Sequence, residues 1–174
     1  MSRVSLNARR QQEAEHTDEV EVVLMQFEHA SLAAPIRVST DPTERISAEP
    51  LLYGTRSRWL DADPATEPFL ALSAYIELPG DQEQAPAGAR ITLEVTNAEL
   101  VTALRGITTR AIAHLCVVLA SAPDEVELEF RDLRLIDVSY DAGSVSLVIT
   151  RNPIEDEGVP CDRITKERFP GLFR

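Results

Sequence analysis

The sequence predicts a mainly β fold of the α+β class, built as a β-sandwich or barrel with two short helices. About seven or eight strand-like segments follow one another, and turn signals separate them at short intervals. Helical patterns occur only over residues 6–16 and near 97–105. Strands and helices therefore do not alternate along the chain, which excludes a βαβ arrangement.

The first half of the chain begins with a polar helix over residues 6–16 that has little apolar surface. The strand predicted over residues 19–28 is apolar on both faces at its middle, which indicates a central position in a sheet. Further strands are predicted over residues 36–40 and 69–78, and the second of these places Leu70, Leu72, Ala74, Ile76 and Leu78 on one face.

The connections in this half are rich in proline and charge. Residues 41–50 and 61–68 each contain two prolines and several charged residues, so we expect loops there. Residues 51–60 are ambiguous, and a strand broken at Gly54 is one interpretation.

Residues 89–106 give the clearest local pattern, a half-buried strand that turns directly into a capped helix. The apolar face of the strand consists of Ile91, Leu93 and Val95. Thr96 and Glu99 have the spacing of a capping box, and Gly106 follows the apolar stripe as a C′ residue. This pattern predicts the short helix near 97–105.

In the second half, the apolar run over residues 111–120 fits either a helix or a strand by periodicity. Its β-branched residues favour a buried strand. From Val126 to Tyr140 the apolar residues change phase twice, which predicts bulges or a corner at which one strand changes sheets. A tight turn at residues 141–143 then leads to a returning strand whose apolar face is Val145, Leu147 and Ile149.

Length and charge limit the classes of function. The 174 residues predict a single domain over 1–174, with a helical N-terminal arm at 1–17 and an irregular C-terminal arm at 152–174. A net charge of −12 argues against binding to nucleic acid. The acids are expected to be a solubilising surface, or alternatively a surface that repels DNA. We find no secretory signal and no membrane-spanning run in the sequence, so we expect a soluble protein made in the cytoplasm.

The sequence contains no spaced catalytic signature, and we predict no catalytic residue, no metal and no cofactor. Cys116 and His114 would share a face of the strand over 111–120, and a buried core pair is favoured there over a Cys–His nucleophile. The carboxylates are expected to be exposed loop residues rather than paired catalytic acids. They are Asp61, Asp63, Glu67, Asp124, Glu125, Glu127, Glu129, Glu155, Asp156 and Glu157.

Residues 169–173 place large apolar side chains in a terminal segment that would otherwise fray. We therefore expect these residues to dock, either onto the protein's own surface or onto a neighbour. The candidate assembly contacts are Phe169, Pro170, Gly171, Leu172 and Phe173.

Several of these segments together resemble a family of small phage-tail proteins from the tail gene clusters of phages and prophages. The similar segments are the polar N-terminal helix, VEVVLMQFEH with PIRVST, ARITLEVTNAELVTALRGI, CVVLASAPDEVEL, VSYDAGSVSLVI and DRITKERFPGLF. The pattern is more distantly similar to the N-terminal part of the lambda-type minor tail protein L. The chain lacks the cysteine-rich region that holds an iron–sulfur cluster in that larger protein, so no cofactor is implied.

The resemblance implies a β-rich domain related to tail-tube and hub folds, located in the virion tail and assembled in the host cytoplasm. It implies a ring at the tail tip, with a trimer favoured over a hexamer. The other implied partners are the tail tube or distal tail protein and the central hub or fibre. Such a ring would let DNA pass without binding it specifically, and it involves no membrane.

Two hypotheses of different classes therefore follow. The first is a structural protein of the tail tip. The second is a small hydrolase or other enzyme that uses Cys116 and His114, or a pair of carboxylates. The missing catalytic spacing favours the structural hypothesis.

Overall fold

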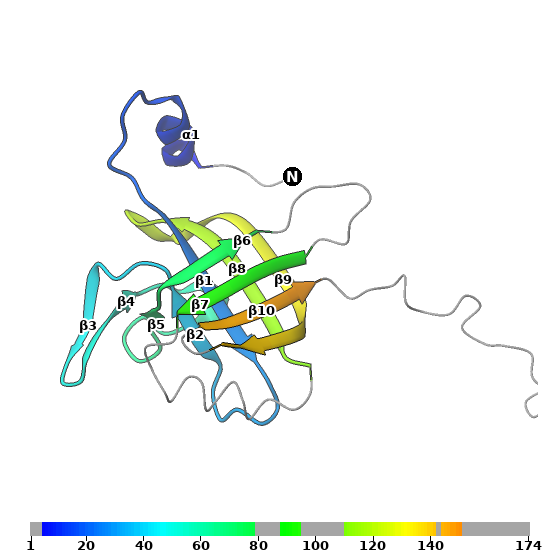
Figure 1. Ribbon diagram of the computed structural model, residues 1–174. Coiled ribbons are helices and arrows are strands. Elements are labelled where there is room, and N and C mark those ends of the chain that lie inside the picture. Colours follow the sequence, from blue (N-terminus) through cyan, green and yellow to red (C-terminus); the bar gives the residue numbers. More distant parts are fainter. Residues whose placement is uncertain (1–4, 79–87, 95–109, 142–143, 151–174) are drawn as a thin grey trace, which may run out of the picture.

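The computed structural model describes residues 5–78, 88–94, 110–141 and 144–150. Within these residues the chain forms one α-helix, one 3₁₀ turn and a single mixed sheet of ten strands (Figure 1). The mainly β, α+β class predicted from the sequence is confirmed.

The helix α1 spans Leu6–Glu13, and the 3₁₀ turn η1 spans Trp59–Asp61. The strands are β1 (Glu21–Glu28), β2 (Ile36–Ser39), β3 (Glu44–Ala48), β4 (Leu51–Thr55), β5 (Phe69–Ala71), β6 (Ala74–Glu77), β7 (Gly88–Glu94), β8 (Ile112–Leu119), β9 (Ala122–Tyr140) and β10 (Ser144–Thr150). Their order in the sheet is β3-β4-β5-β2-β1-β8-β9-β10-β7-β6, and β2 with β5 is the parallel pair.

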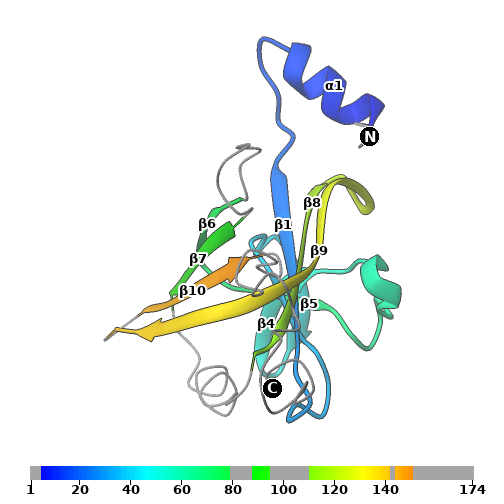
Figure 2. The ribbon, with the colours of Figure 1, turned by 90° about the vertical axis from the view of Figure 1, so that its right-hand side faces the viewer.

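Two parts of the chain make the sheet curve back on itself. The first half of β9 pairs with β8 and its second half pairs with β10, as Figure 2 shows for the long bent strand. The chain also passes directly from β5 to β6. The amide of Leu72 donates to the carbonyl of Ser39, at the end of β2, at 2.9 Å, and the carbonyl of Ser73 accepts from the amide of Glu94, at the end of β7, at 2.8 Å. The result is a barrel-like body.

Bulges in β9 explain the two phase changes in its sequence. Between Ala113 and Leu115 of β8, the facing part of β9 contains one extra residue. Asp132 lies in this bulged part of β9 and has a left-handed φ of 57°. A second irregularity lies opposite Val148 and Ile149 of β10, and Ile136 is the unpaired residue there. The predicted bulges are therefore confirmed, whereas β9 stays within one sheet and does not change sheets.

The core has an inner and an outer part, and β1 and β8 contribute to both. The inner cluster, between the two halves of the sheet, includes Met25, Phe27, Leu115, Ile91 and Leu147. The outer cluster consists of Val22, Leu24, Trp59, Ala62, Phe69, Cys116 and Val118. β1 lies between β2 and β8, which confirms the central position predicted for it.

Two of the segments differ clearly from their sequence-based predictions. Residues 41–50 are not simply a loop, because Glu44–Ala48 form the edge strand β3, which pairs with β4. Pro42 and Pro50 lie outside this strand, on either side of it. Residues 69–78 form two strands rather than one. In β5 the buried residue is Phe69, whereas Leu70 is 37% exposed, because Trp59 packs over the face to which Phe69 points.

Residues 51–55 form β4, which runs through Gly54 without the break suggested there. The remaining predicted strands agree with the structure, and residues 111–120 contain β8 rather than a helix. The helical part of the N-terminal arm is α1, which is shorter than the predicted 6–16. The predicted helix near 97–105, the turn residues 142 and 143 and the C-terminal arm at 152–174 lie outside the described residues.

Candidate functional site beside the Trp59 turn

Residues 57–61 fold over the outer side of the sheet and are fastened to the start of β9. Ser57 is fully buried, and its hydroxyl donates to the carbonyl of Pro123 at 2.7 Å and accepts from the amide of Trp59 at 3.1 Å. The amide of Arg58 donates to Asp124 Oδ1 at 2.7 Å. These bonds hold the turn at a defined position on the sheet.

Trp59 is the anchor of this turn. Its ring packs against Phe69 with centroids 5.9 Å apart, and its indole Nε1 donates to Glu129 Oε1 at 2.7 Å. The same carboxylate oxygen accepts from Arg131 Nε at 2.7 Å. Burial by itself would raise the pKa of Glu129, but the hydrogen bonds from Trp59 and Arg131 outweigh it and lower the pKa. Glu129 is therefore a charged acceptor at neutral pH.

The turn is strained where it leaves Trp59. Leu60 and Asp61 have φ values of 55° and 56°, so the backbone of two consecutive non-glycine residues lies in the left-handed region. Each non-glycine residue in this region costs about 1–2 kcal/mol. Such strain persists only where surrounding contacts impose it, and it is concentrated at functional sites. The turn is therefore the first candidate for a site.

A groove of about 390 Å³ opens beside this turn, and we call it the Trp59 groove. Its charged lining residues are Glu28, Asp61, Asp124, Arg58 and Arg131. Gln26, Trp59, Leu60 and Val126 complete the lining. The groove thus combines carboxylates with a small apolar surface from Trp59 and its neighbours.

A row of polar side chains crosses β2, β1 and β8 next to this groove. Arg37, Gln26 and His114 are paired in register across the three strands. Gln26 is 3% exposed, and its Oε1 accepts from Arg37 Nε at 2.9 Å while its Nε2 donates to Glu28 Oε1 at 2.7 Å. Arg37 also forms an ion pair with Glu67 at 3.3 Å. The buried amide is satisfied at both ends, so this row holds Glu28 in place.

His114 ends this row. The amide of Asp132, in the β9 bulge, donates to His114 Nδ1 at 3.2 Å. A neutral imidazole that accepts at Nδ1 carries its proton on Nε2, and this nitrogen lies 3.8 Å from Glu28 Oε1. The hydrogen bond at Nδ1 therefore orients the ring, and Nε2 faces Glu28 from beyond hydrogen-bond distance.

Cys116 shares a strand face with His114, as predicted, and both residues are buried. Burial raises the pKa of the Cys116 thiol well above its usual range, and the nearby charge of Glu129 raises it further. A nucleophilic cysteine needs the opposite shift and access to substrate. Cys116 packs in the outer cluster and has neither.

The carboxylates are not all loop residues as expected, because Asp124, Glu125, Glu127 and Glu129 lie in β9. The structure brings some of the sequence-selected carboxylates together. Asp61 and Asp124 both line the Trp59 groove, where they meet Glu28. Asp63 lies in the following loop, where hydrogen bonds from the amide of Ala65 and the hydroxyl of Thr66 lower its pKa. Among the residues that the structure describes, no three His, Cys, Asp or Glu side chains are placed to hold a metal ion.

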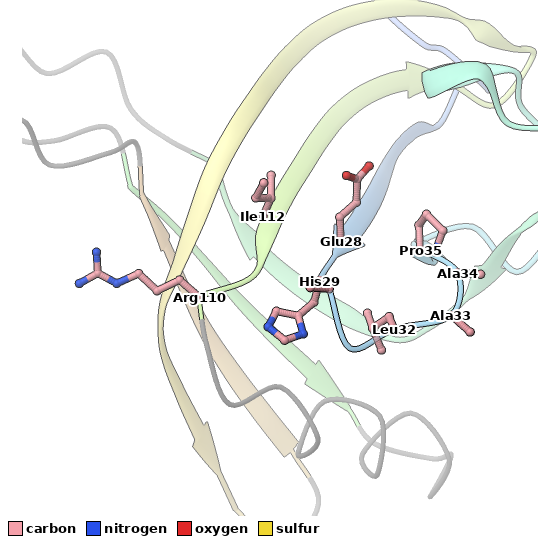
Figure 3. A pocket seen from close by; sticks show the side chains of 9 residues that line it. Glu28, His29, Leu32, Ala33, Ala34, Pro35, Arg110 and Ile112 are labelled. Atoms are coloured by element: carbon pink, nitrogen blue, oxygen red, sulfur yellow. The ribbon is translucent and has the colours of Figure 1, made fainter.

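A second, more apolar hollow of about 540 Å³ lies between the β1–β2 loop and the start of β8 (Figure 3). The loop residues Leu32 and Pro35 line it on one side and Ile112 on the other. In Figure 3 the side chain of Arg110 extends away from the loop. Glu28 lines both this hollow and the Trp59 groove. The hollow has fewer anchored polar groups than the groove.

Sequence reasoning missed Trp59, Glu28, Gln26 and Arg131 as parts of a site. Two signals were present: Trp59 is the single tryptophan, and Gln26 interrupts an otherwise apolar run, VVLMQF. The predicted assembly contacts Phe169, Pro170, Gly171, Leu172 and Phe173 lie outside the described residues, so they stay a prediction.

Comparison with protein-family models and with curated proteins gives no match. In the described part of the chain, no helix has the length and apolar character needed to cross a membrane.

Proposed function

We propose that this protein is a structural subunit of a phage tail tip, where copies of it assemble into a ring between the tail tube and the central hub or fibre. The observation that supports this proposal best is the open sheet order. Its end strands β3 and β6 each have one edge with no partner among the described strands. The resemblance of the sequence to small phage-tail proteins is the basis for locating this ring at the tail tip.

Open strand edges are the natural contacts of an assembling subunit. A free edge presents unpaired N–H and C=O groups that can pair with another chain. β3 carries Glu44 and Arg45 and a register shift, which are features that discourage pairing. β6 carries one exposed charge, Glu77, but has no such shift against β7, and its Tyr75 is 67% exposed. We therefore propose β6 as one assembling edge, whose partner in a ring is a different surface of the neighbouring subunit.

The charge of the chain supports the same function. A ring at the tail tip has to let DNA pass through it. A net charge of −12 disfavours binding to the phosphate backbone, so a negative wall would not retain the DNA.

Sedimentation velocity and negative-stain microscopy of the purified protein test the ring. We expect a discrete closed oligomer, a trimer in preference to a hexamer, with a central opening. A protein that stays monomeric at all concentrations, or that forms only open filaments, would contradict the proposal. The genes that flank this one should also encode tail proteins.

Two lysine substitutions test the β6 edge. Tyr75→Lys places a charge on the open edge strand, and we expect it to weaken assembly. Ser139→Lys is the matched control, because Ser139 and Tyr75 belong to the same register row on the same face, but Ser139 lies on the interior strand β9. Equal assembly of the two variants would exclude β6 as the contact.

A further inference from the structure

The helix α1 presents an exposed outer face, and Arg10 at its margin lines a shallow hollow with Gln11, Ala14, Thr17 and Glu19. Its inner side is Ser5, Ala8 and Gln11, of which Ala8 is buried. The outer side bears Leu6, which is 68% exposed, with Arg9 and Arg10 one turn further along. Neither arginine forms an ion pair within the described residues. Arginine is enriched among the residues that dominate protein interfaces, and the exposed leucine adds apolar surface beside the two arginines.

The arm and the body of the protein carry opposite charges. Residues 1–17 contain three arginines against two acids, Glu13 and Glu15, whereas the whole chain has a net charge of −12. The helix lies beyond the end of β1, to which an extended segment joins it (Figures 1 and 2). A hydrogen bond of 2.8 Å from the amide of Ser5 to Glu127 Oε2 ties the start of the helix to β9. The basic outer face is therefore held outward, where another molecule can reach it.

The Trp59 groove has the complementary chemistry. Within it Arg58 lies 3.9 Å from Asp124, and Arg131 is bonded to Glu129. Two carboxylates then remain without an arginine partner among the described residues, Glu28 and Asp61. Trp59, Leu60 and Val126 offer apolar surface beside them. The outer face of α1 thus offers two arginines and one leucine, and the groove offers an apolar lining and two carboxylates without an arginine partner, of which Glu28 already accepts a hydrogen bond from Gln26.

We propose that the outer face of α1 docks into the Trp59 groove of a second copy of this chain. Leu6 packs against the apolar lining, and Arg9 and Arg10 pair with Asp61 and Glu28. This contact joins two different surfaces, so it is heterologous and can repeat around a ring. The inference deepens the proposed function and rests on the self-assembly that it requires.

Charge reversal tests this contact, with sedimentation velocity of the full chain as the measurement. We expect wild-type association to weaken with added salt. Arg9→Glu together with Arg10→Glu should raise the dissociation constant at least about tenfold. Arg134→Glu is the matched control, because Arg134 is exposed on β9 and has no ion pair within the described residues, and it should leave association unchanged.

A swapped pair makes the test specific. Asp61→Arg alone should also weaken association, and its combination with Arg9→Glu should associate more tightly than either single variant. Thermal melts of every variant check that the domain remains folded.

The inference is wrong if the wild type associates and the double reversal behaves like Arg134→Glu, or if the swap restores nothing. It is also wrong if the reversals lower only the melting temperature, since the arm would then bind its own body. A wild type that never associates would overturn the ring proposal as well.

Discussion

Glu129 is the residue on which the polar side of the site depends. It is the hydrogen-bond acceptor for both the Trp59 indole and the Arg131 guanidinium, and these donors lower its pKa. A carboxylate with a lowered pKa stabilises the folded state above the ordinary glutamate range. This contribution is lost as the pH falls from that range through the lower pKa of the folded state.

Glu129→Gln therefore should lower the free energy of unfolding at pH 7 by about 1 kcal/mol, because a charged acceptor is replaced by a neutral one. Urea unfolding followed by fluorescence measures this, since Trp59 is the single tryptophan and lies in the site. The difference from the wild type should shrink below the ordinary glutamate pKa. A difference that stays constant with pH would contradict the role assigned to the charge.

The thiol of Cys116 should be inert in the folded protein. It is fully buried, and burial raises its pKa, so both access and the thiolate are lacking. In a Cys161→Ser background, a disulfide reagent should react with Cys116 only after denaturation. Rapid reaction of the native protein would show that the outer cluster opens, and it would return the Cys116 and His114 pair to consideration as a nucleophile.

At the scale of the element, Gly54 decides whether β4 can pair with β5. A Cβ at this position would lie 2.0 Å from the carbonyl oxygen of Phe69, which is backbone and cannot move aside cheaply. We expect Gly54→Ala to destabilise the protein by roughly 2 kcal/mol or more. Leu51→Ala on the same strand is the control, because Leu51 is 60% exposed. Similar melting temperatures for the two variants would contradict this close approach.

The first bulge of β9 gives a second prediction for an element. Asp132 has a φ of 57°, a conformation that glycine adopts freely and that β-branched residues strongly avoid. Asp132→Gly should be neutral or stabilising, whereas Asp132→Val should cost about 1–2 kcal/mol. Chemical denaturation measures both. Equal stability of the two variants would mean that the bulge does not require a left-handed residue.

At the scale of the whole molecule, residues 169–173 are predicted to serve assembly rather than folding. Each of Phe169, Leu172 and Phe173 would gain roughly 1.5–3 kcal/mol on full burial. Deletion of residues 169–174 should therefore leave far-UV circular dichroism nearly unchanged and weaken association. An unfolded truncated chain would show that the segment belongs to its own core, and unchanged association would show that it is dispensable.

The alternation of side chains allowed most of the architecture to be predicted from the sequence. The central position of β1, the strand character of β8 and the bulges in β9 all follow from which residues are apolar on one or both faces. Alternation is a local property of a strand, so it can be read without knowledge of what the strand packs against. For the same reason, the buried setting of Cys116 and His114 was predictable from the apolar run around them.

The tertiary structure alone decided which elements meet. β3 was missed because a short, exposed edge strand has no apolar alternation to reveal it, and its pairing with β4 determines its structure. The Trp59 groove combines residues from β1, the 59–61 turn and β9, which are far apart in sequence. Its charges and its strained turn arise from long-range contacts, such as those of Ser57 with Pro123 and of Trp59 with Glu129. Sequence patterns report local periodicity, whereas a site of this kind depends on how the curved sheet brings distant strands together.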